Sequence, residues 1–134
     1  MVWPLVAVAI LTPSLLFSGM AQEVFALPKL NVMVTVLKNP LNVGSMQTVY
    51  VQVTSNGKGV TKAVVYATVI STVELKSFSG KTDSNGKWNF SWQIKGSSKP
   101  GTFHVIVKAS KIGYVSKYGG TAFIVTQKSK IKSK

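Results

Sequence analysis

The 134-residue sequence contains no Cys and no Arg, and it has only three acidic residues and one His. Without Cys the chain forms no disulfide framework, no thiolate nucleophile and no zinc–cysteine site. A single His excludes a metal site built on several imidazoles. Three carboxylates leave little room for acid–base chemistry with paired carboxylates. Composition therefore favours a protein that is not an enzyme and carries no cofactor.

Two features dominate what is present. All 16 basic residues are Lys, which gives a formal net charge of +13, and 46% of the residues are hydrophobic. Hydrophobic content at this level argues against a disordered basic tail. The length allows one domain with a core of its own.

The N-terminus predicts a targeting segment. Residues 1–22 carry no charged side chain, and small residues allow cleavage after Ala21 or after Ala26. We prefer a signal peptide over 1–26, because the strand pattern begins soon after it, and we expect export to the extracellular space or the cell surface. The n-region has no basic residue, so two alternatives stay open. One is an uncleaved membrane anchor in 1–22, since about 20 apolar residues span a bilayer; the other is a misassigned start codon.

Removal of this segment makes the chain still more basic. It takes away Glu23 and no Lys, which leaves 16 Lys, two acidic residues and a net charge of +14. We expect residues 27–127 to form one domain and the Lys-rich residues 128–134 to be a disordered basic tail.

Apolar and polar residues alternate with period two after residue 27, and no stretch has a convincing helical period. Gly, Asn, Ser and Pro stand between the alternating runs. The pattern predicts seven strands, at 30–38, 46–54, 63–71, 72–78, 87–95, 102–110 and 121–127. Seven short strands in about 100 residues are typical of an immunoglobulin-like (Ig-like) β-sandwich, so the predicted fold class is all-β.

The run 87–95 alternates most clearly. Its apolar face carries Trp88, Phe90, Trp92 and Ile94. A large aromatic side chain buries about 150–250 Å², so we place the centre of the core on this strand.

Three short motifs carry a family resemblance. Residues 82–88 hold a Thr-Asp-x-x-Gly turn, 100–105 a Pro-Gly-x-aromatic strand entry, and 109–114 a Gly-Tyr before the last strand. With 59–65 they resemble, in order and spacing, prokaryotic Ig-like modules of surface proteins, of the invasin/intimin-like and carboxypeptidase-regulatory-like kind. The resemblance covers about residues 28–127. It implies a spacer, stalk or adhesion surface and supplies no catalytic residues.

Three polar residues suggest chemistry, but each has a simpler structural role. Asp83, next to Asn85, would be half of a calcium loop, yet calcium requires about 6–8 oxygen ligands, and we expect an Asx turn instead. His104 alternates out of phase with the core face, so we expect it to face solvent, not to bind copper or zinc. We expect Tyr114 to pack over the sheet edge and to bond its hydroxyl to nearby backbone.

Asn89 begins the one N-glycosylation sequon, Asn-Phe-Ser, and faces outward on its predicted strand. Export makes modification possible in a host that glycosylates, while a position within a strand is less accessible than a loop.

The scattered Lys side chains create a field that attracts polyanions. Specific nucleic-acid recognition is disfavoured, because Arg is absent and the strongest aromatic strand faces the core. We expect a protein or an acidic cell-surface polymer as the partner, and contact with a membrane only through the N-terminal segment.

Several outward positions are apolar, which is unusual for a solvent-facing sheet. If the predicted strands at 63–71, 102–110 and 121–127 are neighbours, Tyr66, Ile106 and Ile124 form one patch for a partner or a homo-oligomer. Scattered apolar side chains would need no such explanation.

The sequence thus favours a non-enzymatic exported or cell-surface module for interaction or structure. Two alternatives stay open: an accessory subunit of a membrane complex, tethered by an uncleaved N-terminal helix, and a small periplasmic or extracellular metal carrier.

Overall fold

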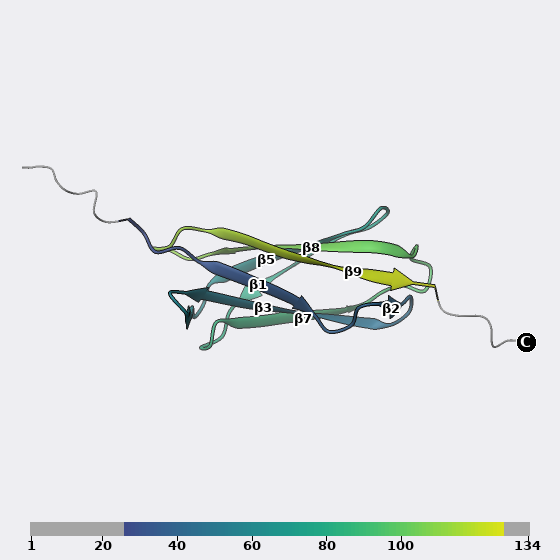
Figure 1. Cartoon of the computed structure of the whole chain (residues 1–134), viewed down its shortest axis with the longest axis horizontal. Helices are drawn as coiled ribbons and strands as arrows, with labels where there is room; N and C mark the ends of the chain where they lie inside the picture. Colours follow the sequence, from purple (N-terminus) through teal and green to yellow (C-terminus); the bar gives the residue numbers. More distant parts are fainter. Residues whose placement is uncertain (1–25, 128–134) are drawn as a thin grey trace, which may run out of the picture.

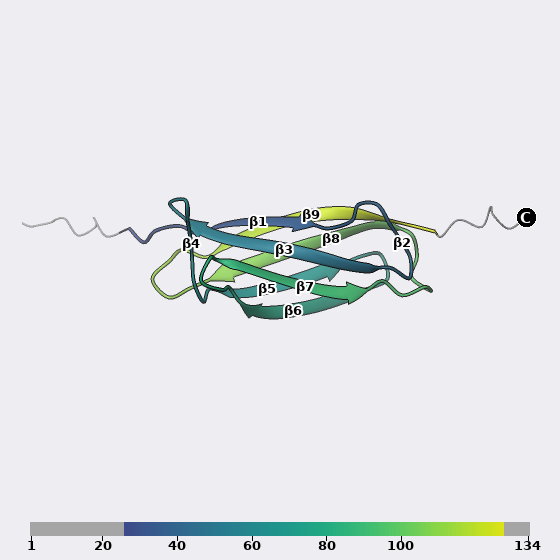
Figure 2. The ribbon, with the colours of Figure 1, turned by 90° about the horizontal axis from the view of Figure 1, so that it is seen from below.

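A computed structural model describes residues 26–127, and these form two β-sheets without a helix (Figures 1 and 2). The four-stranded sheet contains β1 (Asn31–Val36), β3 (Met46–Ser55), β4 (Lys58–Gly59) and β7 (Lys87–Gln93). The five-stranded sheet has the order β2 (Leu41–Asn42), β9 (Lys117–Thr126), β8 (Gly101–Ser110), β5 (Val64–Ile70) and β6 (Leu75–Lys81). The all-β prediction is confirmed for this part of the chain.

The two sheets are layers with one hydrophobic core between them (Figure 1). The long strands contribute alternate side chains to this core, as the geometry of a strand requires. On β3 the buried hydrophobic residues are Val49, Val51 and Val53, and on β8 they include Phe103 and Val105. The side chains between them point away from the core and form the outer face of each sheet. The residues on that face do not take part in core packing.

Aromatic rings of β7 form the centre of the core, as the sequence predicted. Phe90 and Trp92 are buried and stack with ring centroids 5.6 Å apart. Phe90 also stacks on Phe78 of β6 at 4.5 Å, and Trp92 meets Phe123 of β9 edge-on at 6.0 Å. Trp88 is half-buried and contacts Phe90 at 5.1 Å. The rings therefore connect the two sheets across the core.

The described chain has nine strands where the pattern predicted seven. The short strands β2 and β4 were missed, because two residues are too few to show alternation. The predicted strand 72–78 begins only at Leu75, since Ser71 and Glu74 form a turn in which the N–H of Ser71 donates to the carbonyl of Glu74 at 2.9 Å.

β9 begins at Lys117, four residues before the predicted strand 121–127. Its first half contains Gly119 and Gly120, which in a sequence indicate a turn. At Gly119 a Cβ atom would lie 2.6 Å from the carbonyl oxygen of Val32. Glycine is therefore required for the close approach of β1 and β9, which lie side by side in Figure 1.

The N-terminal segment contacts both sheets. β1 pairs antiparallel with β3, and β2 then pairs in parallel with β9, so the chain changes sheets between Val36 and Leu41. A cis peptide bond joins Asn39 and Pro40 at this crossing. The Asn39 side chain accepts a hydrogen bond of 2.9 Å from the N–H of Ile124, which fixes the crossing to β9.

Gln47 is the one fully buried polar side chain at this crossing, with 0% of its surface exposed. Its Oε1 accepts hydrogen bonds from the backbone N–H groups of Lys38 and Thr48, both at 3.1 Å. Its Nε2 donates to the carbonyl oxygen of Lys38 at 2.7 Å. The amide thus satisfies both backbone groups of Lys38 where the chain leaves β1.

We predict that Gln47→Ala lowers the free energy of unfolding by about 2–4 kcal/mol, because it leaves buried backbone groups unpaired and opens a cavity. The matched control is Gln93→Ala. Gln93 is exposed on the neighbouring strand β7 and donates one hydrogen bond to the carbonyl of Gly44, so its loss should cost about 0.5–1 kcal/mol. Urea unfolding of the three proteins tests this, and equal losses in the two variants would contradict it.

Candidate functional site

The outer face of the five-stranded sheet places aromatic and basic side chains in one row. Tyr118 of β9 lies directly opposite Lys108 of β8, and Lys108 lies directly opposite Tyr66 of β5. The two tyrosines are 62% and 52% exposed. We call Tyr118, Lys108 and Tyr66 the basic aromatic row.

Lys108 is held by its aromatic neighbour while it stays accessible. Its Nζ lies 5.8 Å from the centroid of the Tyr118 ring, within the range of a cation–π contact. The two carboxylates of the described residues lie elsewhere: Asp83 in the turn before β7, and Glu74 in the turn before β6, where it accepts a hydrogen bond from Ser98. The positive charge of the row therefore has no acidic neighbour on its face.

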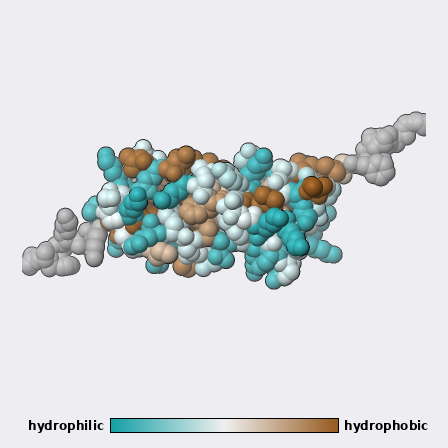
Figure 3. Space-filling view, turned by 180° about the vertical axis from the view of Figure 1, so that it is seen from behind, coloured by the Kyte–Doolittle hydropathy of each residue, from teal (hydrophilic) through white to brown (hydrophobic). Residues whose placement is uncertain are grey.

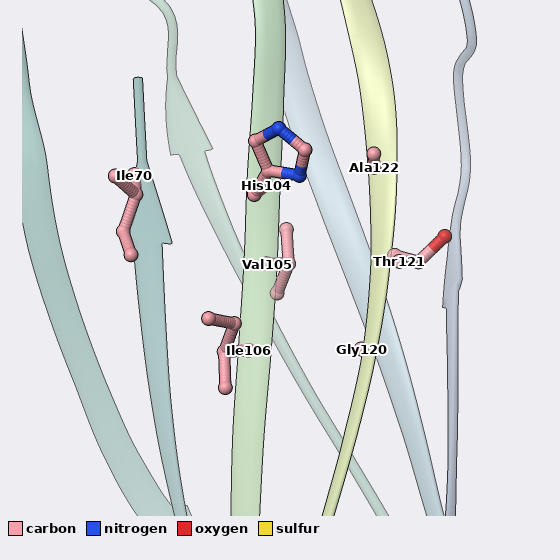
Figure 4. Close-up of a pocket in the computed structure, with 7 residues that line it drawn as sticks. All are labelled: Ile70, His104, Val105, Ile106, Gly120, Thr121 and Ala122. Atoms are coloured by element: carbon pink, nitrogen blue, oxygen red, sulfur yellow. The ribbon is translucent and has the colours of Figure 1, made fainter. Parts of the chain in front are cut away.

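A shallow depression lies beside this row (Figure 4). Ile70 of β5 and Ile106 of β8 border it on one side. On the other side β9 carries Gly120 and Ala122. Because glycine has no side chain and alanine a small one, the surface is low there. His104 stands next to Ile106 on β8 and is exposed. The depression is mainly apolar and carries one imidazole.

The structure brings together two of the three predicted patch residues. Tyr66, Ile106 and Ile124 are all exposed on the outer face of this sheet. Ile106 pairs with Thr68, so Tyr66 is its diagonal neighbour, at a distance of about 7–8 Å. Ile106 pairs with Gly120 on β9, and Ile124 lies four residues farther along that strand. Ile124 is therefore separated from the other two.

The view from behind shows hydrophobic residues in separate groups among hydrophilic ones (Figure 3). On that side of the molecule the apolar residues do not merge into one large surface.

Sequence reasoning did not single out Lys108 or Tyr118. Lys108 was one of many scattered Lys residues, and Tyr118 preceded the predicted start of the last strand. The signal that could have found them is the register of the last two strands, since residues 101–109 of β8 pair with residues 117–125 of β9. Gly119 and Gly120 indicate a turn in the sequence, so the start of β9 at Lys117 was not predicted.

His104 is exposed, as the alternation predicted. Among residues 26–127 no group of three or more His, Asp or Glu side chains could hold a metal ion.

The structure also places the other three polar residues that the sequence analysis named, Asp83, Asn89 and Tyr114. Asp83 Oδ1 accepts backbone hydrogen bonds from Asn85 at 2.8 Å and from Lys87 at 3.0 Å, which confirms the Asx-type turn. Asn89 is exposed on β7, within the strand. Tyr114 is half-buried against the core, and its backbone N–H donates to the carbonyl of Lys111 at 3.0 Å.

The predicted signal peptide or anchor at 1–26 and the tail at 128–134 lie, except for Ala26, outside the described residues. Between residues 26 and 127 there is no helix of the length and hydrophobicity that a membrane crossing needs.

The turn at Asp83 gives a testable dependence on pH. The N–H of Lys87, and then that of Asn85, stabilise the carboxylate and hold the pKa of Asp83 below its ordinary value. A lowered pKa in the folded state stabilises the fold above the unfolded-state pKa, and this contribution is lost as pH falls through the folded-state pKa. We predict that the stability difference between wild type and Asp83→Asn is constant at neutral pH and shrinks below about pH 3.9. Urea unfolding at a series of pH values measures it, and a constant difference at all pH values would contradict the prediction.

No protein-family model and no curated protein matches the sequence. The resemblance to invasin/intimin-like modules thus has no support from a family model. Among solved structures the chain is similar to the soluble domain of PmoD from Methylocystis sp. ATCC 49242 (Rockwell), with 9% identity and a TM-score of 0.48 over 71% of this chain and 90% of that one.

It is also similar to the CARDB domain of the PF1109 protein from Pyrococcus furiosus, with 13% identity and a TM-score of 0.48 over 76% of this chain and 96% of that one. A β-glucosidase from Listeria innocua matches with 13% identity and a TM-score of 0.45 over 73% of this chain but only 16% of the enzyme. These similarities concern the β-sandwich-like fold and say nothing about activity.

Proposed function

We propose that this chain is a non-enzymatic, exported Ig-like module that binds an acidic polymer of the cell surface. The binding face is the outer face of the five-stranded sheet. The observation that carries the proposal is the basic aromatic row, in which an exposed Lys stands between two exposed tyrosines.

The strand order supports the Ig-like assignment. β1, β3 and β7 form one layer, and β9, β8, β5 and β6 form the other. This corresponds to the division of strands in Ig-like sandwiches, whose faces and end loops commonly carry binding sites. Fold alone does not give function, so the partner is inferred from the residues of the face.

The row fits a polymer that alternates flat apolar surfaces with carboxylates. Neighbouring strands are about 4.8 Å apart, which places the backbones of Tyr118 and Tyr66 about 10 Å apart with Lys108 between them. The two rings offer flat faces for sugar rings, and the ammonium group of Lys108 offers an ion pair to a uronic acid between them. Ile106 extends the apolar surface beside Tyr66.

The charge of the whole chain supports the same partner. A formal net charge of +13 attracts an acidic polymer over a distance, and the row then supplies the close contacts. Exposed ion pairs are weak singly and are screened by salt, so a polymer that makes many contacts is a better partner than a small anion.

The positions of the ionisable groups favour binding over catalysis. Asp83 and Glu74 belong to different turns, and His104 stands beside aliphatic residues. Asp83, Glu74 and His104 are thus spread over separate places in the fold and do not converge on one catalytic centre.

We predict that polygalacturonate binds the wild-type protein and that a neutral galactan binds less tightly at low salt. Lys108→Gln should weaken the binding of polygalacturonate about fivefold, because an exposed ion pair contributes up to about 1 kcal/mol. The double variant Tyr66→Ser and Tyr118→Ser should weaken it by roughly tenfold. Affinity should fall as the salt concentration rises.

The control is Lys95→Gln, which removes the same charge from an exposed position outside the row. Equal losses for Lys95→Gln and Lys108→Gln would show non-specific attraction and overturn the proposed site. Gel filtration at the same concentrations tests self-association, the other use of an apolar sheet face. A dimer that Tyr66→Ser dissociates would assign the face to a second copy of the chain and not to a polymer.

A further inference from the structure

The outer face of the four-stranded sheet has a different character from the basic face. In Figure 2 β1, β3 and β7 lie side by side. Thr35 of β1 lies directly opposite Tyr50 of β3, and Tyr50 lies directly opposite Asn89 of β7. All three side chains are exposed, Tyr50 by 44%. We call Thr35, Tyr50 and Asn89 the neutral row.

The neutral row lines a cleft of about 490 Å³. Met33, Gln52 and Lys87 form the next row of the same face and also line the cleft, and Asp83 closes it from the turn before β7. Tyr50 stands on the central strand, so the other polar groups surround its ring. This arrangement offers one aromatic surface with hydrogen-bonding groups around it.

The polar groups of the neutral row have free hydrogen-bonding capacity. On the same face Thr48 and Ser91 bond to each other at 2.8 Å, and Gln52 donates to the carbonyl oxygen of Asn85 at 2.9 Å. The side chains of Thr35, Tyr50 and Asn89 make no hydrogen bond within residues 26–127. A ligand that brings both donors and acceptors would therefore find a hydroxyl, a phenol and an amide available.

The charge of the cleft is balanced although the chain is strongly basic. Lys87 and Asp83 stand together at one end, and the N–H of Lys87 donates to Asp83 Oδ1 at 3.0 Å. That bond comes from the backbone of Lys87, so its ammonium group stays available, and the formal charges of the two lining side chains sum to zero. The neutral row itself carries no charged side chain, in contrast to the row around Lys108.

We propose that this cleft binds a neutral oligosaccharide, with one sugar ring on the face of Tyr50. A pyranose ring presents an apolar face of C–H groups to an aromatic ring and hydroxyl groups around its edge. Thr35 and Asn89, on opposite sides of Tyr50, would bond those hydroxyls directly. Asn89 then acts as a contact residue for sugar and not as an attachment site for a glycan. The site lies on the opposite sheet from the proposed polyanion site and does not depend on it.

The test uses the chain produced in a bacterial host that leaves Asn89 unmodified. Cellohexaose, xylohexaose, chitohexaose, mannohexaose and maltohexaose are each titrated into the protein at low millimolar concentration, and binding is followed by two-dimensional NMR of the backbone amides. We expect at least one of the five to shift the amides of Thr35, Tyr50 and Asn89, while the amides of Tyr66 and Lys108 stay unchanged.

Variants then assign the contact. Tyr50→Ala should weaken binding at least about tenfold, and Asn89→Ala should weaken it several-fold, whereas Tyr50→Phe should preserve most of the affinity because the ring remains. Leu75→Ala is the control, an exposed side chain on the other sheet outside both proposed sites, and should bind like wild type. Thermal unfolding confirms that each variant is folded, and Tyr50→Leu replaces Tyr50→Ala if the latter is not.

Two results would overturn the proposal. One is that none of the five oligosaccharides shifts the amides of the neutral row at the highest concentration. The other is that one of them binds but Tyr50→Ala and Leu75→Ala affect its binding equally. Polygalacturonate binding through Lys108 is measured separately, so failure of one site leaves the other result intact.

Discussion

The aromatic rings between the sheets determine where every other side chain points. Phe90 and Trp92 of β7 lie buried against Phe78 and Phe123 of the opposite layer, and this packing fixes the register of β7. A slip by one residue would turn these rings to solvent and bring Asn89 and Ser91 into the core. Trp92 Nε1 is buried and has no hydrogen-bond partner among residues 26–127, so this side chain contributes through its apolar area. The packing of the buried side chains thus decides which residues stand on the outer face of each sheet.

The two proposed sites lie on one small scaffold and differ in chemistry. Lys108 stands between two tyrosines on one sheet, and Tyr50 stands between two uncharged polar side chains on the other. They lie on outer faces that point in opposite directions, with the core between them. Occupation of one face does not cover the other. A module of this kind would join two different polymers, which is a structural use of binding without catalysis.

Alternation predicted most of the fold, because a strand with one buried face shows its period directly in the sequence. Residues 87–95 show this best, and the buried faces of β3, β5 and β8 followed the same rule. The pattern failed where tertiary contact overrides local preference: Gly119 indicates a turn, yet it belongs to a strand because β1 passes close to it. The residues of the candidate sites come from different strands, and only the register of strand pairing shows which of them are neighbours. Tyr66 and Ile106 lie on neighbouring strands, whereas Ile124 is farther away, and the neighbours of Lys108 and Tyr50 are known only from the pairing of the strands.

The parallel pair of β2 and β9 has a consequence for mechanical load. The described chain starts at one end of the sandwich and finishes at the other (Figure 1). A pull on these two ends would load the bridge between Lys29 and Val115 and the pairing of β1 with β3 first, and it would then shear β2 along β9. In that step the hydrogen bond from the N–H of Val43 to the carbonyl of Thr126 and that between Thr126 and Asn42 would be loaded at the same time. Bonds loaded together resist more force than bonds opened one by one. The short strand β2 would therefore add resistance to a load applied along the long axis of the sandwich.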